Sequence, residues 1–482
     1  MNLLIIIGTS HWFIKSNALL TNYVLPNPTI KSELVLNINT LFNYLTLNTF
    51  NWDKTSYIFI LLTLFLVPFS LLSNWNSIVI FNSKRVFFSL LVWIEIMLLI
   101  TFSTTDLFIF YLAFEGLSIP VFFLIFMFGA EITKIRASIY FLLYSLSSST
   151  FMAIAIFLLY SQFGTTDINL LRSRFLSSLV SLTPNYTTTY IYPVYTDNLI
   201  PVLTFERLGI LWLFLFLSFA IKMPLVPFHM WLPEAHAEAP TSGSILLTGV
   251  ILKLGGYGIF KFFLPILGNF TYFIPFVYTL CIIGIVYVGL TCLRINHLKQ
   301  IIAYSSIVHM NATCLGLFTN KTVSLSGAIY SMISHSLISA SLFLLAGILY
   351  NRYESYLIEN YSGLSYNMPY FCFFFTFMII ANIATPLTSG FISELLILID
   401  LGKINLFILL LFGLNYLINT GYSVWLLNRI VFTDSTFNPK PQKNKYIYYT
   451  DLNTLEISML SATSFLIIIL GIIPNIIVVG LS

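Results

Sequence analysis

Long apolar stretches recur along this chain from about residue 56 to residue 481. Each contains about 18 residues or more, which is enough to cross a hydrocarbon layer about 30 Å thick as a helix. Hydrophobic residues make up 58% of the 482 residues and charged residues 8%, against roughly 25% charged in a typical soluble domain. A water-soluble fold cannot cover so much apolar surface. The sequence therefore predicts an all-α polytopic membrane protein.

The apolar stretches predict about twelve spanning helices, and a short N-terminal helix within 1–20 would add a thirteenth. That first segment contains His11 and Lys15 and shows no convincing cleavage site, so we interpret it as a helix and not as a removed signal peptide. The predicted spans are 56–73, 86–103, 106–129, 134–162, 207–221, 241–263, 270–292, 298–318, 325–350, 369–402, 404–430 and 454–481.

Proline interrupts two of these spans. Pro224 and Pro227 follow Lys222 at the end of one, and Thr385-Pro386 splits the span 369–402. Proline removes a helix hydrogen bond, and unpaired backbone groups in hydrocarbon cost several kcal/mol unless protein or a water-filled cavity satisfies them. Breaks at corresponding places in two halves are typical of transporter-like repeats, although two unrelated kinks would give the same pattern.

The breaks suggest a division into four regions: N-terminal helices in 1–105, a first bundle in 106–263, a second bundle in 270–430, and a basic loop with a C-terminal helix in 431–482. The connection 163–206 is rich in Ser, Thr, Tyr and Pro, and 433–453 carries three lysines, Lys440, Lys443 and Lys445. Neither connection contains a nucleotide-binding glycine pattern. We interpret both as surface segments.

Charge and cysteine content exclude several classes of function. The net charge of +4 is small and the basic residues are scattered, so we expect no nucleic acid partner. The four cysteines lie in apolar segments without a C-x-x-C pair, so neither a zinc site nor an iron–sulfur cluster is indicated, and we expect no metal or cofactor bound by this chain.

Six ionisable residues fall near the middle of their helices or beside a helix break. At a rise of 1.5 Å per residue, Glu115 lies roughly 14 Å into its helix, and His335, His309 and Lys253 lie roughly 15 to 18 Å into theirs. Lys222 and Glu394 lie beside the two breaks. A charged side chain at a helix centre costs about 2.5–3.5 kcal/mol on insertion scales, so the set is expected to face the bundle interior and to have a function.

Burial disfavours the charged form of a side chain and a nearby opposite charge favours it, so a lysine under both influences can gain or lose a proton when a neighbouring charge moves. Glu115 is the natural partner of Lys222. Lys253, His309 and His335 would continue the route toward Glu394, with intervening waters carrying the proton. We therefore predict a row of buried groups that transfers protons.

Several long motifs resemble the chain 4 family of NADH:ubiquinone oxidoreductase, respiratory complex I. Residues 220–244 include Leu-Pro-Glu-Ala-His-Ala-Glu-Ala-Pro, and residues 251–258 read Ile-Leu-Lys-Leu-Gly-Gly-Tyr-Gly. The resemblance extends to 114–120, 298–311, 390–396 and 422–429 and covers most of residues 52–480.

The resemblance implies an antiporter-like, proton-translocating subunit of the membrane arm, with two inverted five-helix repeats that form half-channels, each with a broken helix. It implies that Glu115 and Lys222 form the first half-channel's pair, Lys253 the central relay, His309 and His335 its continuation, and Glu394 the exit-side acid. NAD(H), FMN, iron–sulfur clusters and ubiquinone would be bound by other subunits, and this chain would have no redox centre. Neighbouring antiporter-like subunits and lipids would be its partners in the mitochondrial inner membrane, and its abundant Phe, Ile, Asn and Tyr fit an organelle-encoded gene.

The chain departs from the family pattern in three places. The family usually has fourteen helices, and the N-terminal part of this chain is one short; the connection 163–206 is longer than usual; and Ser336 follows His335 where the family commonly has Gly. None of these departures touches a proposed relay residue.

Three other functions compete with this prediction. A subunit of a multi-subunit Na⁺/H⁺ antiporter would share the fold and the Glu–Lys pair, but the two motifs quoted above favour the respiratory subunit. A haem-binding cytochrome is suggested by His309 and His335 on neighbouring helices, although such proteins usually need two stacked histidine pairs. A purely structural scaffold leaves the charges near the membrane centre unexplained.

Overall fold

The computed structural model describes residues 53–74, 83–129, 133–180, 205–268, 270–361, 363–432 and 450–475. Within these ranges nearly every residue is helical and no strand is formed, which confirms the all-α prediction. Ten helices in the described ranges are long and apolar enough to span a membrane. The predicted helix within 1–20 and the basic segment 433–449 lie outside the described residues.

The first half of the described chain contains these helices: α3 Lys54–Ser73, α5 Lys84–Ser103, α6 Leu107–Gly116, α7 Ser118–Phe128, α8 Lys134–Phe163, α9 Ile168–Val180, α10 Phe205–Lys222, α11 Trp231–Glu238, α12 Thr241–Leu246, η1 Leu247–Ile251, α13 Lys253–Gly258, η2 Ile259–Phe263 and α14 Leu264–Leu267. The second half contains these: η3 Thr271–Phe273, α15 Ile274–Cys292, α16 Leu298–Phe318, α17 Thr322–Tyr353, η4 Ile358–Asn360, α18 Leu364–Asn367, α19 Pro369–Asn382, α20 Ser389–Ile404, α21 Leu406–Leu427, η5 Asn428–Phe432 and α22 Thr454–Ile472.

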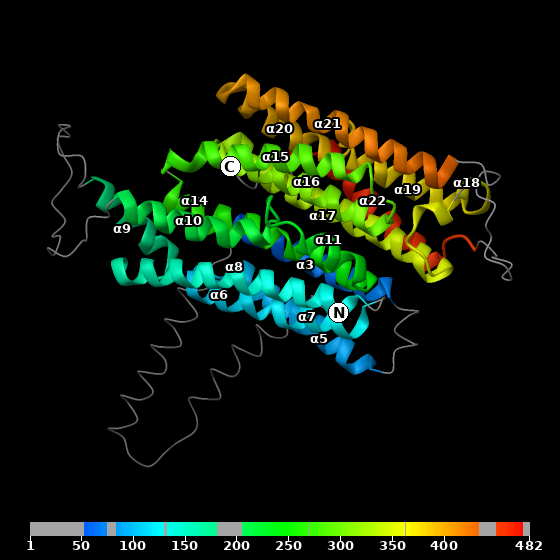
Figure 1. The fold of residues 1–482 in the computed structure, drawn as a ribbon, viewed down its shortest axis with the longest axis horizontal. Coiled ribbons are helices and arrows are strands. Elements are labelled where there is room, and N and C mark those ends of the chain that lie inside the picture. The colour runs from blue at the N-terminus through cyan, green and yellow to red at the C-terminus, as the bar shows by residue number, and fades with distance from the viewer. Residues whose placement is uncertain are drawn as a thin grey trace, which may run out of the picture.

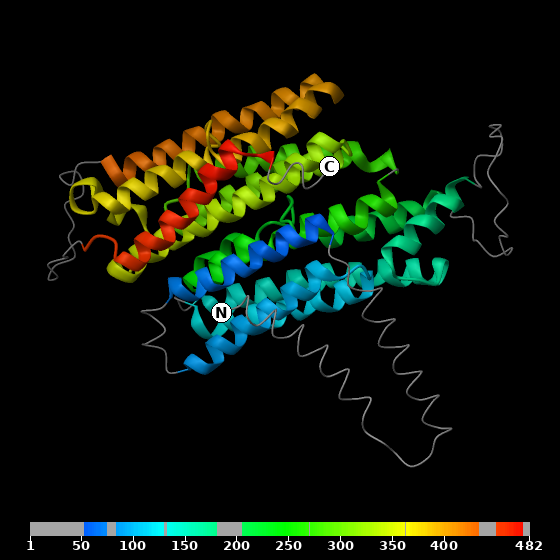
Figure 2. The same cartoon turned by 180° about the vertical axis from the view of Figure 1, so that it is seen from behind.

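The long helices run side by side in rows that follow the order of the chain. Figure 1 shows α5 to α8 in one row, α10 and α11 in the next, then α15 to α17, and α19 to α21 at the far edge. Seen from behind in Figure 2, α3 (blue) runs along the middle of the bundle, and α22 (red) lies at a steeper angle over the yellow-green helices of the second half. α17 is the innermost helix, and its apolar core segment is completely buried. A path from α6 to α20 therefore crosses the whole molecule through buried helices.

Both predicted helix breaks are present. α10 ends at Lys222 and the chain resumes as α11, while α19 ends at Asn382 and α20 begins at Ser389. At each break a side chain binds a freed carbonyl: the Trp231 indole donates to Ile221 O (3.0 Å), and the Asn419 amide donates to Asn382 O (3.0 Å). The protein itself thus satisfies backbone groups that hydrocarbon could not.

The structure differs from the sequence prediction in three segments. The connection 163–206 contains the helix α9, which the polar composition of the whole segment concealed, and Arg174 on α9 donates to Phe163 O at the end of α8. The span 106–129 is divided into α6 and α7 at Leu117. The span 241–263 continues to Leu267 and includes two π-helical segments, η1 and η2, on either side of Lys253. The division into two inverted repeats stays a prediction.

Glycines bring α13 into backbone contact with the end of α10. A Cβ added at Gly255 would lie 3.0 Å from Met223 N and 3.1 Å from Phe219 O. These neighbours are backbone atoms, which cannot move aside without shifting the helix. This contact fixes the position of Lys222, next to Met223, relative to Lys253, two residues before Gly255.

We predict that Gly255→Ala lowers the stability of the protein by about 1–3 kcal/mol, because overpacking at a backbone contact displaces a helix. Gly421→Ala on α21 is the matched control, since nothing lies within 4 Å of its added Cβ. Thermal unfolding of the detergent-solubilised protein measures both. Equal melting temperatures for the two variants would show that the α10–α13 contact tolerates a methyl group.

Candidate functional site

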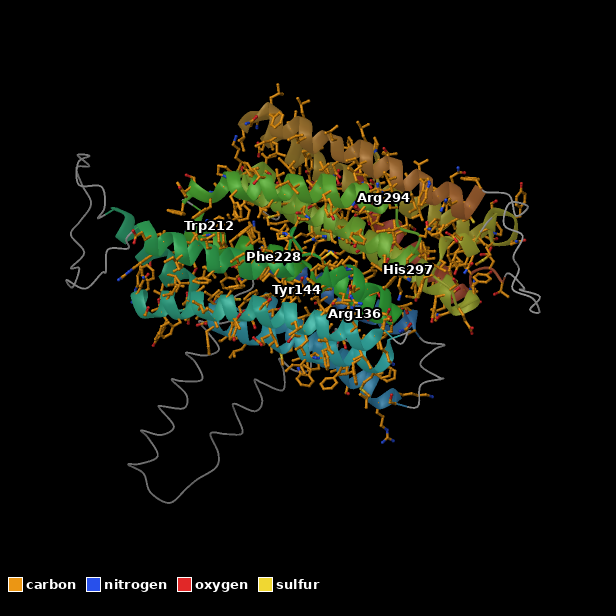
Figure 3. All side chains as sticks on the ribbon, in the orientation of Figure 1. Arg136, Tyr144, Trp212, Phe228, Arg294 and His297 are labelled. Carbon is orange, nitrogen blue, oxygen red and sulfur yellow. The ribbon has the colours of Figure 1, made fainter. Side chains whose placement is uncertain are left out.

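The predicted proton-transfer residues lie on six different helices that the rows bring together. Glu115 is on α6, Lys222 ends α10, Lys253 begins α13, His309 and His335 are on α16 and α17, and Glu394 is on α20. All except Glu115, which is partly buried, are buried. Figure 3 shows the side chains filling the space between the rows.

The central contact joins Lys253 to His335. Lys253 Nζ lies 2.9 Å from His335 Nδ1 and also donates to Thr248 O. Lys253 is 0% exposed. A hydrogen bond from an amine to an imidazole nitrogen lets a proton pass between two groups that can each hold it, so this contact is chemically suited to proton transfer.

The row continues from His335 to Glu394. The rings of His335 and His309 have centroids 5.4 Å apart, and His309 Nδ1 lies 3.3 Å from Glu394 Oε1. A small cavity of about 20 Å³ lies among these three residues and is also lined by Ser331 and Ser334. A cavity of this size and polarity can hold about one water molecule. One water is enough to bridge the two imidazoles, so these side chains form a nearly continuous path.

Glu115 and Lys222 are not in direct contact, contrary to the pairing expected from the sequence. Among the described residues no ion pair within 4.0 Å joins them, although the two side chains interact electrostatically. Lys222 Nζ instead lies over the aromatic ring of Phe114, 4.6 Å from its centroid. A desolvated cation–π contact is worth about 2 kcal/mol or more, so the ring stabilises the cation where the sequence suggested a carboxylate.

The two parts of the row meet where α10 packs on α13. In the described part of the chain no hydrogen bond connects Lys222 to Lys253, but the Met223–Gly255 contact holds their helices together. The structure therefore provides a contiguous segment from Lys253 to Glu394, and a backbone packing contact places the helix end that carries Lys222 against this segment.

His236 on α11 is a residue of this region that the sequence analysis did not select. It is 0% exposed, its ring stacks on Phe343 at 4.9 Å, and neither ring nitrogen has a hydrogen-bond partner. It interacts electrostatically with Lys253 and Lys299. The signal that could have found it is its place in the broken segment that follows Lys222 and Pro227.

The haem alternative does not fit the geometry of the histidines. His335 Nδ1 contacts Lys253, His309 Nδ1 faces Glu394, and the cavity between the rings is far too small for a macrocycle. Among the described residues no group of three or more His, Cys, Asp or Glu side chains could hold a metal ion.

Comparison with known proteins defines the class to which this fold and row of charges belong. The family described as NADH:quinone oxidoreductase/Mrp antiporter, transmembrane, matches residues 104–418. The fold is similar to a chain of respiratory complex I from Thermus thermophilus with bound NADH, with a TM-score of 0.76 and 24% identity over 90% of this chain and 84% of that chain. It is also similar to a chain of the Mrp complex from Dietzia, with a TM-score of 0.73 and 17% identity over 90% of this chain and 83% of that chain. The protein is thus an antiporter-like membrane subunit.

Curated relatives narrow the class. NADH-ubiquinone oxidoreductase chain 4 of Chondrus crispus is 39% identical over 428 residues, which cover 89% of this chain and 80% of the relative. The same chain of Metridium senile is 38% identical over 429 residues, covering 88% and 80%. This chain belongs to the NADH-ubiquinone oxidoreductase chain 4 family, as the motifs predicted.

We predict that Ser334→Val closes the cavity between His335 and Glu394. The added methyl groups would occupy the space that a bridging water needs. High-resolution density maps of the assembled complex should show a water between the imidazoles in the wild type and none in the variant. Ser326→Val, a buried serine on α17 that does not line this cavity, is the control and should leave that density unchanged. Density for the water in Ser334→Val would contradict the prediction.

Proposed function

We propose that this chain translocates protons as a membrane-arm subunit of NADH:ubiquinone oxidoreductase in the mitochondrial inner membrane. The observation that carries the proposal is the path Lys253–His335–His309–Glu394, in which successive groups are within hydrogen-bond distance or one water apart. Other subunits bind NADH, FMN, iron–sulfur clusters and ubiquinone, and this chain contributes no redox centre. Its partners are the other subunits, above all adjacent antiporter-like ones, and lipids.

Each step of the path is an ordinary proton transfer. The Lys253 ammonium gives a proton to His335 Nδ1, and the imidazolium releases a proton from its other nitrogen to a water in the cavity. That water protonates His309, whose Nδ1 faces the Glu394 carboxylate. Every group can return the proton by the reverse step, so the direction is set by the charges at the two ends.

Lys222 and Glu115 supply the controlling charge at one end. Lys222 is stabilised by Phe114 and not by a direct carboxylate contact, so its protonation state depends on the electrostatic balance around it. A proton that reaches Lys222 places a second positive charge next to the Lys253 segment and drives the proton on Lys253 toward Glu394. Electron transfer elsewhere in the complex would have to shift this balance once per cycle.

The antiporter alternative shares the fold and the broad family that matches residues 104–418, but not the similarity to chain 4. The Mrp chain is similar at 17% identity, whereas the chain 4 relatives are 38–39% identical. Purification from membranes distinguishes the two, because a respiratory subunit brings flavin and iron–sulfur subunits with it and an antiporter subunit does not.

We predict that Lys222→Ala and Glu115→Ala each slow proton-coupled quinone reduction about tenfold or more while the complex still assembles, since each removes a group that controls proton transfer. Proton uptake and NADH:quinone turnover in sealed membranes measure the effect. Lys321→Ala, at the N-cap of α17, is the control and should behave as wild type. Wild-type pumping by an assembled Lys222→Ala complex would exclude the proposal for this end of the row.

Glu394→Gln tests the other end against a closely matched carboxyl. Asp400 lies on the same helix and is equally buried, but it accepts a hydrogen bond from Ser324 N and pairs with Lys403. We expect Glu394→Gln to abolish pumping without loss of assembly. Asp400→Asn should keep pumping and lose about 1 kcal/mol of stability, as for a weakened helix cap. Normal pumping in Glu394→Gln together with loss of pumping in Asp400→Asn would show that Asp400, and not Glu394, transfers the proton.

A further inference from the structure

A second buried polar cluster lies further along the helix that carries Lys253. Lys261 on η2 lies within a spanning helix, and its side chain is buried inside the protein, with 7% exposed. Its Nζ is 3.3 Å from Asp53 Oδ2 and donates to Ser56 Oγ at 2.9 Å. An amine buried in this way needs partners, and here they come from the first turn of α3.

Hydrogen bonds extend this cluster into the protein. Ser56 Oγ lies 2.9 Å from the Tyr257 hydroxyl, and that hydroxyl donates to Phe102 O at 2.8 Å. A phenol has one hydrogen, so Ser56 must donate to Tyr257. Both Ser56 and Tyr257 are 0% exposed. Lys261, Ser56 and Tyr257 thus form a chain in which every donor points inward.

The outer end of the chain opens into a cavity. Asp53 and Lys261 line a space of about 560 Å³, together with Asn169, Arg172 and Asn320. The Asp53 side chain is 52% exposed. Trp212, labelled toward one end of the bundle in Figure 3, packs on Phe263 beside this region, at 5.4 Å between ring centroids. The cavity is lined by both polar and apolar side chains and is large enough for many waters.

The inner end of the chain lies one turn from the central lysine. Lys253, Tyr257 and Lys261 are spaced at four-residue intervals, and the first two lie within α13. Residues four apart are neighbours on one helix face, about 6 Å apart along the axis. No other part of the proposed function uses Tyr257, Ser56, Lys261 or Asp53.

We propose that the cavity, Asp53, Lys261, Ser56 and Tyr257 form a gated port through which Lys253 exchanges protons with water at this end of the bundle. The inference rests on the proposed function and adds a branch to the relay. The gate is the Tyr257 hydroxyl. In this structure it donates to a backbone carbonyl, which cannot pass a proton on, so the port is closed.

The transfer through the open port balances in protons. The Tyr257 hydroxyl turns away from Phe102 O and gives its proton, through a bridging water, to the neutral Lys253 amine one helical turn away. Tyr257 receives the Ser56 proton, Ser56 receives one from Lys261, and Lys261 is reprotonated from the cavity through Asp53. One proton leaves the cavity, one arrives at Lys253, and the three intermediate groups are unchanged.

The competing explanation is that Tyr257 only caps the end of α5, where Phe102 O lies in the last turn. Tyr278 provides a matched control, because its buried hydroxyl donates to Phe318 O (3.3 Å), the last residue of α16. We expect Tyr257→Phe to slow proton-coupled quinone reduction by the assembled complex about tenfold or more, and Tyr278→Phe to change it less than about twofold. Similar rates for the two variants would overturn the proposal.

Two further variants keep the test decisive. Ser56→Ala cuts the chain with the loss of one oxygen atom and should reproduce Tyr257→Phe; normal turnover in an assembled Ser56→Ala complex contradicts the port. In Asp53→Cys the new thiol should react with a charged, membrane-impermeant reagent from one side, against a low background because Cys281, Cys292, Cys314 and Cys372 are buried. No reaction from either side also overturns it.

Lys222→Ala and Glu394→Gln, measured in parallel, distinguish a failure of the port from a failure of the proposed relay. Loss of pumping in Lys222→Ala with normal pumping in Tyr257→Phe and Ser56→Ala rejects the port and keeps the relay. Normal pumping in Lys222→Ala rejects only the role of Lys222, whereas normal pumping in Glu394→Gln rejects the relay on which the port depends.

Discussion

The hydrogen bond between Lys253 and His335 is the interaction on which the rest of the site depends. It joins α13, in the first half of the described chain, to the innermost helix α17, in the second half. An amine with no exposed surface is costly in hydrocarbon unless it is bound. Lys253 is bound by an imidazole and a carbonyl, and no carboxylate among the described residues pairs with it. A basic partner that can itself accept the proton is what the proposed transfer requires, and a fixed ion pair would not provide it.

Packing of small residues and helix breaks makes that contact available. Gly255 lets the end of α10 approach α13 at backbone distance, which brings the helix end at Lys222 close to the Lys253 segment. At both breaks a side-chain amide or indole binds the freed carbonyl, so the irregular backbone is stable inside the bundle. In the proposed function, Lys222 and the Lys253 segment must each be able to gain and lose a proton. A direct ion pair would hold such a group in one charge state.

The sequence predicted the fold class, both breaks and the burial of five of the six selected ionisable residues, because apolar length and proline are local properties. It did not predict which groups touch. Glu115 and Lys222 have opposite charges at similar depth, yet Phe114 occupies the place beside the lysine, and only the tertiary packing decides that. His236 was missed because its exposure depends on Phe343 and α17, and the cluster around Lys261 because Ser56 and Tyr257 are 201 residues apart in the chain.

Proton translocation by the complex with Lys253→Met tests the central claim most directly. The substitution keeps the length and apolar stem of the side chain and removes the only atom that binds His335. Reconstituted in sealed liposomes, the assembled variant should transfer fewer protons per electron pair and reduce quinone more slowly than the wild type. A wild-type proton-to-electron ratio at the wild-type rate would contradict the account, because no proton could then be passing through the Lys253–His335 contact.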